Sequence, residues 1–174
     1  MKRAVFVWEL FGFALTSLLG TLLHFLYEWL GDAILIAPFS GVNESTWEHM
    51  KLLFWPMLAF AIAESLFFKA YPTFWCVKLR GILIGLGLIP LIFYTYNGVI
   101  GKSPDFVNIA IFFVSAASAY IYETRLFSAE KRCLLPQKWA LGTLLALAAL
   151  FAVFTFHAPH INLFKDPVTG AYGI

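Results

Sequence analysis

The stretch NESTWEHMK, residues 43–51, gathers acidic, basic, amide and hydroxyl side chains within a chain that is 61% hydrophobic. Carboxylates and imidazoles are the side chains that enzymes commonly use to move protons. Ser45 lies four residues before His49, so a helix places both on one face. Glu44, Ser45 and Glu48 are therefore the candidate catalytic residues.

The histidines form a second pattern, because all of them are expected at the same, extracytoplasmic end of the helices. They are His24, His49, His157 and His160. A catalytic zinc site uses three protein ligands and leaves one position for water, and the metal lowers the pKa of that water toward about 7. The four histidines are therefore candidate zinc ligands, with Glu28, Glu44 or Glu48 as the candidate base.

Further polar residues at this end are candidates for orienting a ligand or contacting a substrate. They are Glu28, Asn43, Tyr94 and Asn97. Glu28 ends a series at four-residue spacing that begins with Gly12, Thr16 and Gly20 and continues through His24. Small residues at this spacing let membrane helices approach closely. His24 and Glu28 are therefore expected to point into a helix bundle, where ionisable residues tend to be functional.

Structural roles explain part of the same pattern. Ser45 and Glu48 form the S-x-x-E sequence of a capping box, in which side chains satisfy free N–H groups at a helix start. A histidine at a helix C-terminus, such as His157 or His160, is stabilised by the helix dipole. His49 contributes nothing to the cap and needs another explanation.

Membrane helices are the elements that would position these residues. Charged residues make up 13% of the 174 residues and the mean hydropathy is +0.80, whereas a soluble domain carries roughly 25% charge. Crossing a bilayer core about 30 Å thick takes roughly 20 helical residues. Five stretches approach that length: residues 5–30, 47–69, 80–99, 106–123 and 138–157. They lack the alternation of barrel strands, so we predict an all-α, five-helix transmembrane bundle that forms one domain over residues 1–174.

Basic residues predict the orientation of this bundle. Nine flank the helices on one side and three on the other, and the richer side faces the cytoplasm. The nine are Lys2, Arg3, Lys69, Lys78, Arg80, Arg125, Lys131, Arg132 and Lys138, and the three are Lys51, Lys102 and Lys165. In the cell membrane, the N-terminus is therefore expected on the cytoplasmic side and the C-terminus on the outer side. Cys76 and Cys133 are expected on the cytoplasmic, reducing side.

Three segments carry weaker expectations. At the inner end, Glu9 and Glu64 are expected to pair with basic residues of the membrane surface. The candidate partners are Lys69, Arg80 and Arg125. The apolar connection from residue 31 to 43 is expected to lie in the outer interface or to re-enter the bundle. The C-terminal tail, residues 161–174, contains turn residues and would cover the polar end as a lid.

The VNESTWEHMKLLFWP stretch, with HFLYEW before it and DPVTGAYGI at the end, resembles a family of small bacterial multi-spanning membrane proteins of unassigned function. The likeness covers most of the chain and implies no activity. More weakly, the chain resembles the alkaline ceramidase and adiponectin-receptor superfamily of membrane hydrolases, which bind zinc through a Ser-x-x-x-His helix and a paired-His final helix. Ser45 and His49 match the first pattern, and His157 and His160 approximate the second. That superfamily has seven spans and a three-residue gap between the paired histidines.

Two classes of function fit these residues, and the sequence leaves open whether the protein is an enzyme. A zinc-dependent hydrolase would act on a lipid or another amphiphile that arrives from the outer leaflet. Alternatively, the polar cluster binds or transports a small molecule or ion without chemistry, or it only caps the helices of a structural membrane protein. The lipid bilayer is the required partner, nothing in the spread of basic residues indicates nucleic acid, and the oligomeric state stays open.

Overall fold

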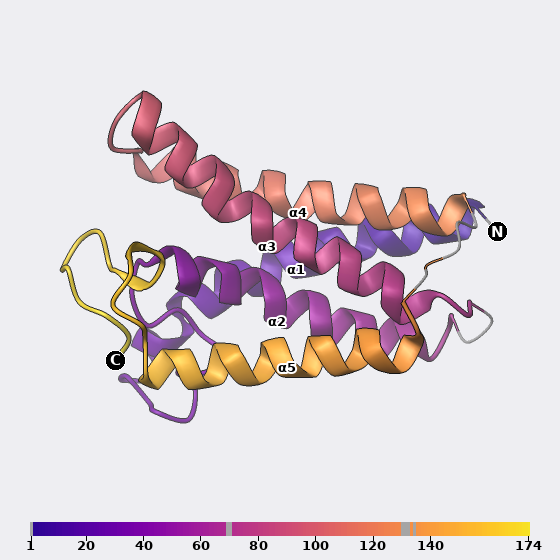
Figure 1. Cartoon of the computed structure of the whole chain (residues 1–174), viewed down its shortest axis with the longest axis horizontal. Helices are drawn as coiled ribbons and strands as arrows, with labels where there is room; N and C mark the ends of the chain where they lie inside the picture. The colour runs from indigo at the N-terminus through magenta and orange to yellow at the C-terminus, as the bar shows by residue number, and fades with distance from the viewer. Residues whose placement is uncertain (1, 69–70, 130–132, 134) are drawn as a thin grey trace.

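The computed structural model describes residues 2–68, 71–129, 133 and 135–174, and Figure 1 shows the path of the chain. Within these residues the helices are α1 (Lys2–Trp29), α2 (Thr46–Ser65), α3 (Phe74–Val99), α4 (Asp105–Ser128) and α5 (Gln137–Phe156). The tail adds a 3-10 turn, η1 (Asn162–Phe164), and an isolated bridge between Lys165 and Tyr172. The all-α prediction is confirmed.

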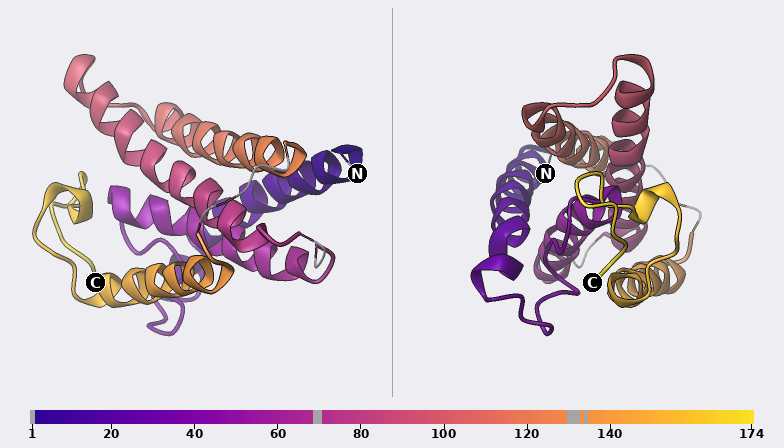
Figure 2. Two further views of the ribbon diagram at one scale, coloured as in Figure 1. Left: turned by 45° about the vertical axis from the view of Figure 1, so that its right-hand side comes forward. Right: turned by 90° about the vertical axis from the view of Figure 1, so that its left-hand side faces the viewer.

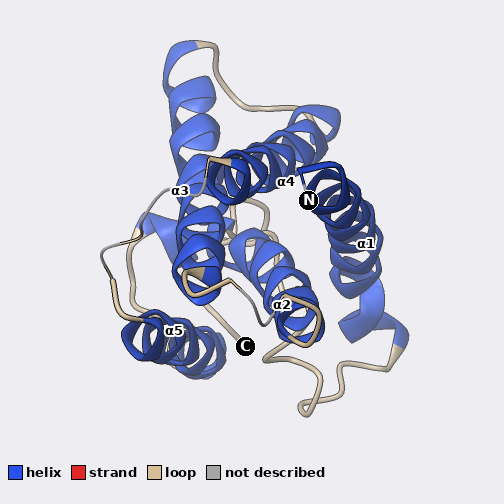
Figure 3. Ribbon diagram, turned by 90° about the vertical axis from the view of Figure 1, so that its right-hand side faces the viewer, coloured by secondary structure: helices blue, strands red, loops and turns tan. Residues whose placement is uncertain are grey.

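Helix α2 lies at the centre of the bundle and packs against each of the other four helices. Figure 3 looks along the bundle and shows α1, α4, α3 and α5 around it. Leu53, Phe54 and Phe60 of α2 are buried in the apolar core. Successive helices run in opposite directions, so the two termini lie at opposite ends of the bundle (Figures 1 and 2).

Four of the described helices, α1, α3, α4 and α5, are long and apolar enough to cross a membrane. Helix α2 differs because Glu48, Lys51 and Glu64 lie within it, and these side chains are buried inside the bundle. Large apolar side chains such as Phe11 and Ile121 are exposed on the outer helices. The structure is therefore that of a helical membrane protein, and the predicted five spans are supported for four.

Two helices extend further than the hydrophobic pattern predicts. Helix α3 begins at Phe74 instead of residue 80, and α4 continues to Ser128 instead of ending at residue 123. The added residues bring Lys78 into α3 and continue α4 beyond Glu123, and both side chains are buried. Lys78 therefore does not flank the bundle at the membrane surface as the orientation count assumes. Lys69, Lys131 and Arg132 of that count lie outside the described residues.

The predicted small-residue face of α1 is present and brings this helix close to α2 and α4. A Cβ atom on Gly20 would lie 2.5 Å from the Phe112 ring and 2.9 Å from the carbonyl oxygen of Leu52. Four residues earlier, the Oγ1 atom of Thr16 lies 2.7 Å from the Oη atom of Tyr120. This close packing fixes the position of α1 just before its polar C-terminal end.

A disulfide joins Cys76 of α3 to Cys133 in the connection between α4 and α5. Disulfides persist in oxidising compartments and are rare in the cytosol. The count of basic residues, by contrast, predicts that this end of the bundle faces the cytoplasm. The bond and the charge count therefore indicate opposite compartments for the same end.

Candidate functional site

Two histidines and one carboxylate from three parts of the chain meet at the C-terminal end of α1. The Nε2 atom of His24 lies 3.6 Å from Oε1 of Glu44, and the Nε2 atom of His49 lies 3.6 Å from Oε2 of the same residue. The imidazole centroids are 5.6 Å apart. All three side chains are partly exposed, and Glu44 is the most exposed at 48%. We call His24, Glu44 and His49 the polar triad.

The hydrogen bonding of His49 sets the chemistry of the polar triad. Its Nδ1 atom lies 2.9 Å from the carbonyl oxygen of Ser45. A carbonyl oxygen only accepts, so Nδ1 carries the hydrogen atom and donates it. In the neutral imidazole, the bare Nε2 atom then faces the Glu44 carboxylate, which is a second acceptor. A proton, a cation or a hydrogen-bond donor between these two groups would satisfy both.

A hydroxyl group inserted into α1 sets the backbone beside His24. The Oγ atom of Ser40 accepts a hydrogen bond from the amide of Tyr27 at 2.9 Å and donates to the carbonyl oxygen of Leu23. Such an insertion into the ladder of helix hydrogen bonds is a known cause of helix bending. The amide of Gly41 also bonds to the Leu23 carbonyl, and a Cβ on Gly41 would lie 3.7 Å from Nδ1 of His24. The apolar connection before α2 thus folds back onto α1.

Asn43 and Ser45 fix the start of α2 and with it the place of Glu44 between them. The Oδ1 atom of Asn43 accepts from the amide of Ser45 at 2.9 Å, and the Oγ atom of Ser45 accepts from the amide of Glu48 at 3.4 Å. The Glu48 carboxylate accepts from the amide of Val42 at 3.1 Å. The serine half of the predicted capping box is therefore present, while the Glu48 side chain caps the amide three residues before Ser45.

Glu48 lies in the interior of the bundle in an ion pair. Its Oε2 atom lies 2.5 Å from Nζ of Lys51, and both side chains are buried. Lys51 also donates to the carbonyl oxygen of Ala37 at 2.7 Å and to the hydroxyl of Thr155 at 3.0 Å. The pair therefore ties α2 to the preceding connection and to α5. Glu48 and Ser45, both candidate catalytic residues, serve the helix start and this ion pair.

The other two histidines occupy separate positions at the same end. His157 is the C-cap residue of α5 and is exposed, and the imidazole of His160 stacks on the Tyr172 ring with centroids 4.5 Å apart. In the described part of the chain, no group of three or more His, Cys, Asp or Glu side chains is placed to hold a metal ion. The structure therefore does not assemble the four histidines into one metal site, and zinc binding stays a prediction.

A cavity of about 640 Å³ adjoins the polar triad. Its apolar walls come from the helix interiors and include Leu52, Ile89, Phe93, Ile111 and Phe112. Its polar lining, besides the polar triad, consists of Thr21, Thr46, Asn97, Lys102, Ser103, Asp105 and Asn108. Volumes of about 300 to 1,000 Å³ with mainly apolar walls and a few polar groups are typical of small-molecule sites.

Asn97 organises the turn between α3 and α4 at the edge of the cavity. Its Nδ2 atom donates to Oγ of Ser103 at 3.2 Å, and its Oδ1 atom accepts from the Ser103 amide at 2.9 Å. Ser103 in turn donates to Oδ1 of Asn108 at 2.7 Å. Ser103 and Asn108 are absent from the predicted site. The polar sequence GKSPDFVN, residues 101–108, between two apolar helices was the available signal.

The C-terminal tail forms part of the cavity wall through Pro167 and Val168. Tyr94 holds the tail by donating from its hydroxyl to the carbonyl oxygen of Asn162 at 2.9 Å. Asn43 holds it a second time, since its Nδ2 atom donates to the carbonyl oxygen of Gly173 at 3.1 Å. Asn43 and Tyr94 thus act by fastening the tail beside the cavity, in keeping with the expected lid.

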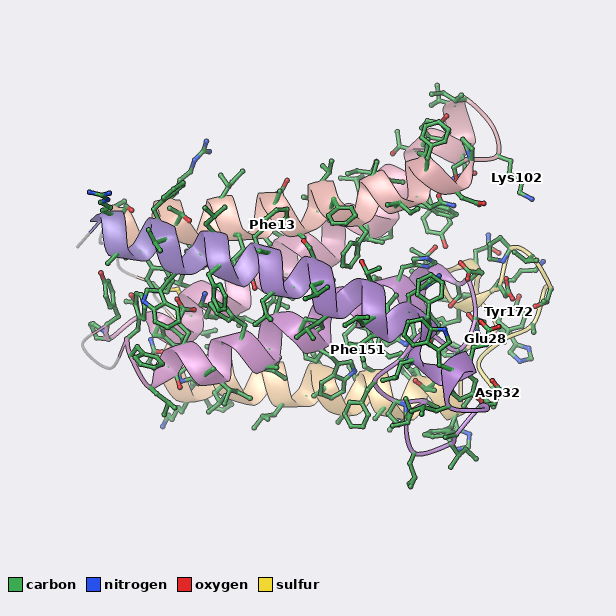
Figure 4. All side chains as sticks on the ribbon, turned by 180° about the vertical axis from the view of Figure 1, so that it is seen from behind. Phe13, Glu28, Asp32, Lys102, Phe151 and Tyr172 are labelled. Atoms are coloured by element: carbon green, nitrogen blue, oxygen red, sulfur yellow. A yellow bond between two sulfur atoms is a disulfide. The ribbon has the colours of Figure 1, made fainter. Side chains whose placement is uncertain are left out.

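Glu28 does not contribute to this site. Its side chain is exposed, although the four-residue series in α1 predicts that it points into the bundle. The prediction fails because α1 reaches its last turn there, beyond the small residues that pack against α2 and α4. Figure 4 shows Glu28, Asp32, Lys102 and Tyr172 at this polar end of the molecule, whereas Phe13 and Phe151 lie further along the bundle.

Four apolar helices of membrane-spanning length around a central helix, with a mainly apolar cavity at one end, are the features of a helical membrane protein with a cavity of ligand size. Residues 2–174 match the family described as "Family of unknown function (DUF6512)", and the chain belongs to this family. Comparisons with curated proteins and with solved structures found no match. Membership of a family without an assigned function agrees with the sequence prediction, whereas the likeness to the ceramidase superfamily stays a prediction.

Proposed function

We propose that the protein binds a small amphiphilic molecule within the membrane, with its apolar part in the cavity and its polar head at the polar triad. The observation that carries this proposal is the composition of the cavity. Its apolar lining includes Leu52, Ile89 and Phe112 from within the helices, whereas its polar lining comes mostly from helix ends and from the turn between α3 and α4. An amphiphile is the ligand class that matches such a division.

The polar triad favours a head group that is positively charged or donates hydrogen bonds. Glu44 supplies two acceptor oxygens, and the Nε2 atom of His49, which is a bare acceptor in the neutral imidazole, faces one of them. An ammonium group placed between them donates to both, and hydrogen bonds of a charged group contribute about 1.5 to 3 kcal/mol. A primary amine at the end of an alkyl chain is therefore the simplest probe of this site.

Two aromatic side chains indicate how a lipid-soluble ligand enters the cavity. Phe25 of α1 and Phe113 of α4 line the cavity, and both side chains are exposed. Both belong to helices that are long and apolar enough to cross a membrane. The proposed route for the ligand therefore runs from the bilayer between α1 and α4.

Dodecylamine binding to the protein in lipid nanodiscs tests this function. We expect dodecylamine to stabilise the wild-type protein against thermal unfolding, since ligands that bind only the folded state raise its stability. Glu44→Gln should weaken the apparent affinity about tenfold or more, whereas Glu28→Gln, at an exposed carboxylate outside the cavity, should leave it unchanged. Dodecanoate should bind more weakly than dodecylamine. Equal binding by wild type and Glu44→Gln, or a preference for dodecanoate, would contradict the proposal.

The predicted zinc-dependent hydrolase is tested separately by elemental analysis of the purified protein. Two imidazoles and a carboxylate match the chemistry of a catalytic zinc site, but their arrangement is not that of a metal site within the described residues. Stoichiometric zinc that is lost in both His24→Ala and His49→Ala would replace the binding function by metal chemistry at the same residues.

A further inference from the structure

A second ionic cluster lies at the opposite end of the bundle and receives one side chain from each of four helices. The Nζ atom of Lys78 in α3 lies 2.9 Å from Oε1 of Glu9 in α1, 2.5 Å from Oε2 of Glu64 in α2 and 2.7 Å from Oε2 of Glu123 in α4. We call these four residues the buried quartet. Glu9 and Glu64 thus pair with an interior lysine, and among the described residues neither Arg80 nor Arg125, which the sequence suggests as partners, forms an ion pair with them. The third suggested partner, Lys69, lies outside the described residues.

The buried quartet is enclosed by apolar and aromatic groups. At most 1% of each of its four residues is exposed. The rings of Phe60, Phe74, Tyr120 and Phe127 surround Nζ of Lys78 at 5.4 to 5.8 Å from their centroids. A separate apolar cluster closes the near end of the bundle and consists of Val5, Phe68, Phe74, Val77 and Phe127. Charges in this place are therefore removed from water.

The charges of the buried quartet do not balance if every group is ionised. One ammonium and three carboxylates would carry a net charge of −2. Burial of an unpaired charge is so costly that a titratable group usually becomes neutral instead. The ring faces around Lys78 favour its ammonium form. The carboxylates are therefore the groups that become neutral, by binding protons. Two bound protons bring the quartet to neutrality.

The contacts among the carboxyl groups provide places for these protons. Glu9, Glu64 and Glu123 each place an oxygen against the same Nζ atom of Lys78, so their carboxyl groups lie beside one another. Two carboxylates cannot bond to one another without a proton, because both only accept. Moreover, the buried Oε1 atoms of Glu64 and Glu123 have no hydrogen-bond partner among the described residues. Glu64 meets Lys78 at 2.5 Å without the alignment of a hydrogen bond, so neither of its oxygens is satisfied by an ordinary donor.

We propose that the buried quartet is a proton-binding site, in which Lys78 stays charged while Glu9, Glu64 and Glu123 share two protons at neutral pH. The ligand of this site is the proton, and the site is independent of the amphiphile cavity at the other end. Tyr120 of α4 is a further titratable group that faces Lys78. Loss of a proton leaves uncompensated negative charge among α1, α2 and α4.

Infrared difference spectroscopy of the purified, membrane-reconstituted protein in D2O tests the proposal, because protonated carboxyl groups absorb apart from carboxylates. At neutral pH, the wild-type protein should show a band of buried protonated carboxyl groups whose intensity corresponds to two such groups per molecule. Because the quartet stays neutral, Glu9→Gln should leave one protonated carboxyl group per molecule, and Glu9→Gln/Glu64→Gln should leave none. Lys78→Met removes the positive charge and should raise the number to three. Glu28→Gln, at an exposed carboxylate, should change nothing.

The wild-type protein alone provides a second test that needs no folded variant. Its protonated carboxyl band should persist at neutral pH and disappear on alkaline titration. Absence of the band in the wild type at neutral pH, or a band that none of the quartet substitutions alters, would overturn the proposal. Failure of dodecylamine to bind would leave both infrared results unaffected, so the two proposals are tested separately.

Discussion

The Nζ atom of Lys51 lies 2.5 Å from the Oε2 atom of Glu48, and neither side chain reaches the surface. The lysine also donates to the Ala37 carbonyl and the Thr155 hydroxyl. One buried ion pair therefore joins the central helix to α5 and to the connection that folds back beside His24. The same connection forms the backbone next to the polar triad, so this ion pair supports the site without lining it.

We expect Lys51→Met to destabilise the protein by about 3 to 5 kcal/mol, because removing one partner leaves a buried charge without compensation. Glu48→Gln should be destabilising for the same reason, whereas Lys51→Met/Glu48→Gln should cost less than the sum of the two changes. Lys102→Met, at an exposed lysine, serves as the control. Denaturant titration in detergent measures these differences, and additive effects of the two substitutions would argue against direct coupling.

Acidic pH should weaken the binding of dodecylamine. Protonation of His49 places a hydrogen atom between Nε2 and the Glu44 carboxylate, which occupies the acceptor that the amine would use. Protonated imidazoles also repel a cationic head. Affinity should therefore be lower when the imidazoles of the polar triad are protonated, as measured by titration in nanodiscs at several pH values. In His24→Asn/His49→Asn the fall should be absent, and a fall that persists there would assign the pH dependence to other groups.

Alkaline pH should lower the stability of the bundle through the buried quartet. If the folded state holds two protons that exposed carboxyl groups lack at neutral pH, the unfolded chain binds fewer protons than the native protein. The free energy of unfolding then decreases as pH rises, by about 1.4 kcal/mol per pH unit for each proton. Thermal unfolding across neutral and alkaline pH measures this slope. It should be shallower in Glu9→Gln/Glu64→Gln, and a stability that rises with pH in the wild type would contradict the expectation.

The tail should govern how fast a ligand leaves the cavity. Asp166 closes the loop that carries Pro167 and Val168, because it accepts from the Val168 amide at 2.8 Å and from the Thr169 hydroxyl at 2.6 Å. We expect Asp166→Ala to loosen this wall and to increase the dissociation rate of dodecylamine several-fold. Each lost hydrogen bond contributes only about 0.5 to 1.5 kcal/mol, so the fold should persist. Asp32→Asn, at an exposed acid of the same end, is the control for stopped-flow measurements.

Hydrophobic length predicts the helices of this fold because a bilayer fixes the number of residues that must be apolar. It misplaces the start of α3 and the end of α4, since Lys78 and Glu123 interrupt the apolar pattern and are typical of helix flanks. Their burial depends on Glu9 and Glu64, which belong to other helices. A pairing between distant segments leaves no local pattern in the sequence.

The sequence predicts only part of the candidate site, because it indicates where residues lie along the bundle but not which side chains meet. The distance of a residue from a helix end indicates its position along the bundle axis. His24, Glu44 and His49 share this position, and their side chains also point toward one another. His157 shares the position alone and is exposed, and His160 turns to Tyr172. The direction of a side chain around the bundle depends on packing, such as the Ser40 hydroxyl inserted into α1, and no count of residues provides it.

Cysteine labelling decides the orientation of the bundle and the compartment of the disulfide. In Cys76→Ser/Cys133→Ser, reporters are introduced by Lys165→Cys at the tail and Leu135→Cys at the other end, both at positions with exposed side chains. The basic residues predict that a membrane-impermeant maleimide labels K165C in intact cells and L135C only after permeabilisation. The opposite pattern would put the Cys76–Cys133 bond in an oxidising compartment, where disulfides persist. With the predicted pattern, the native cysteines should instead be free thiols that react after permeabilisation without a reductant, because the cytosol keeps thiols reduced.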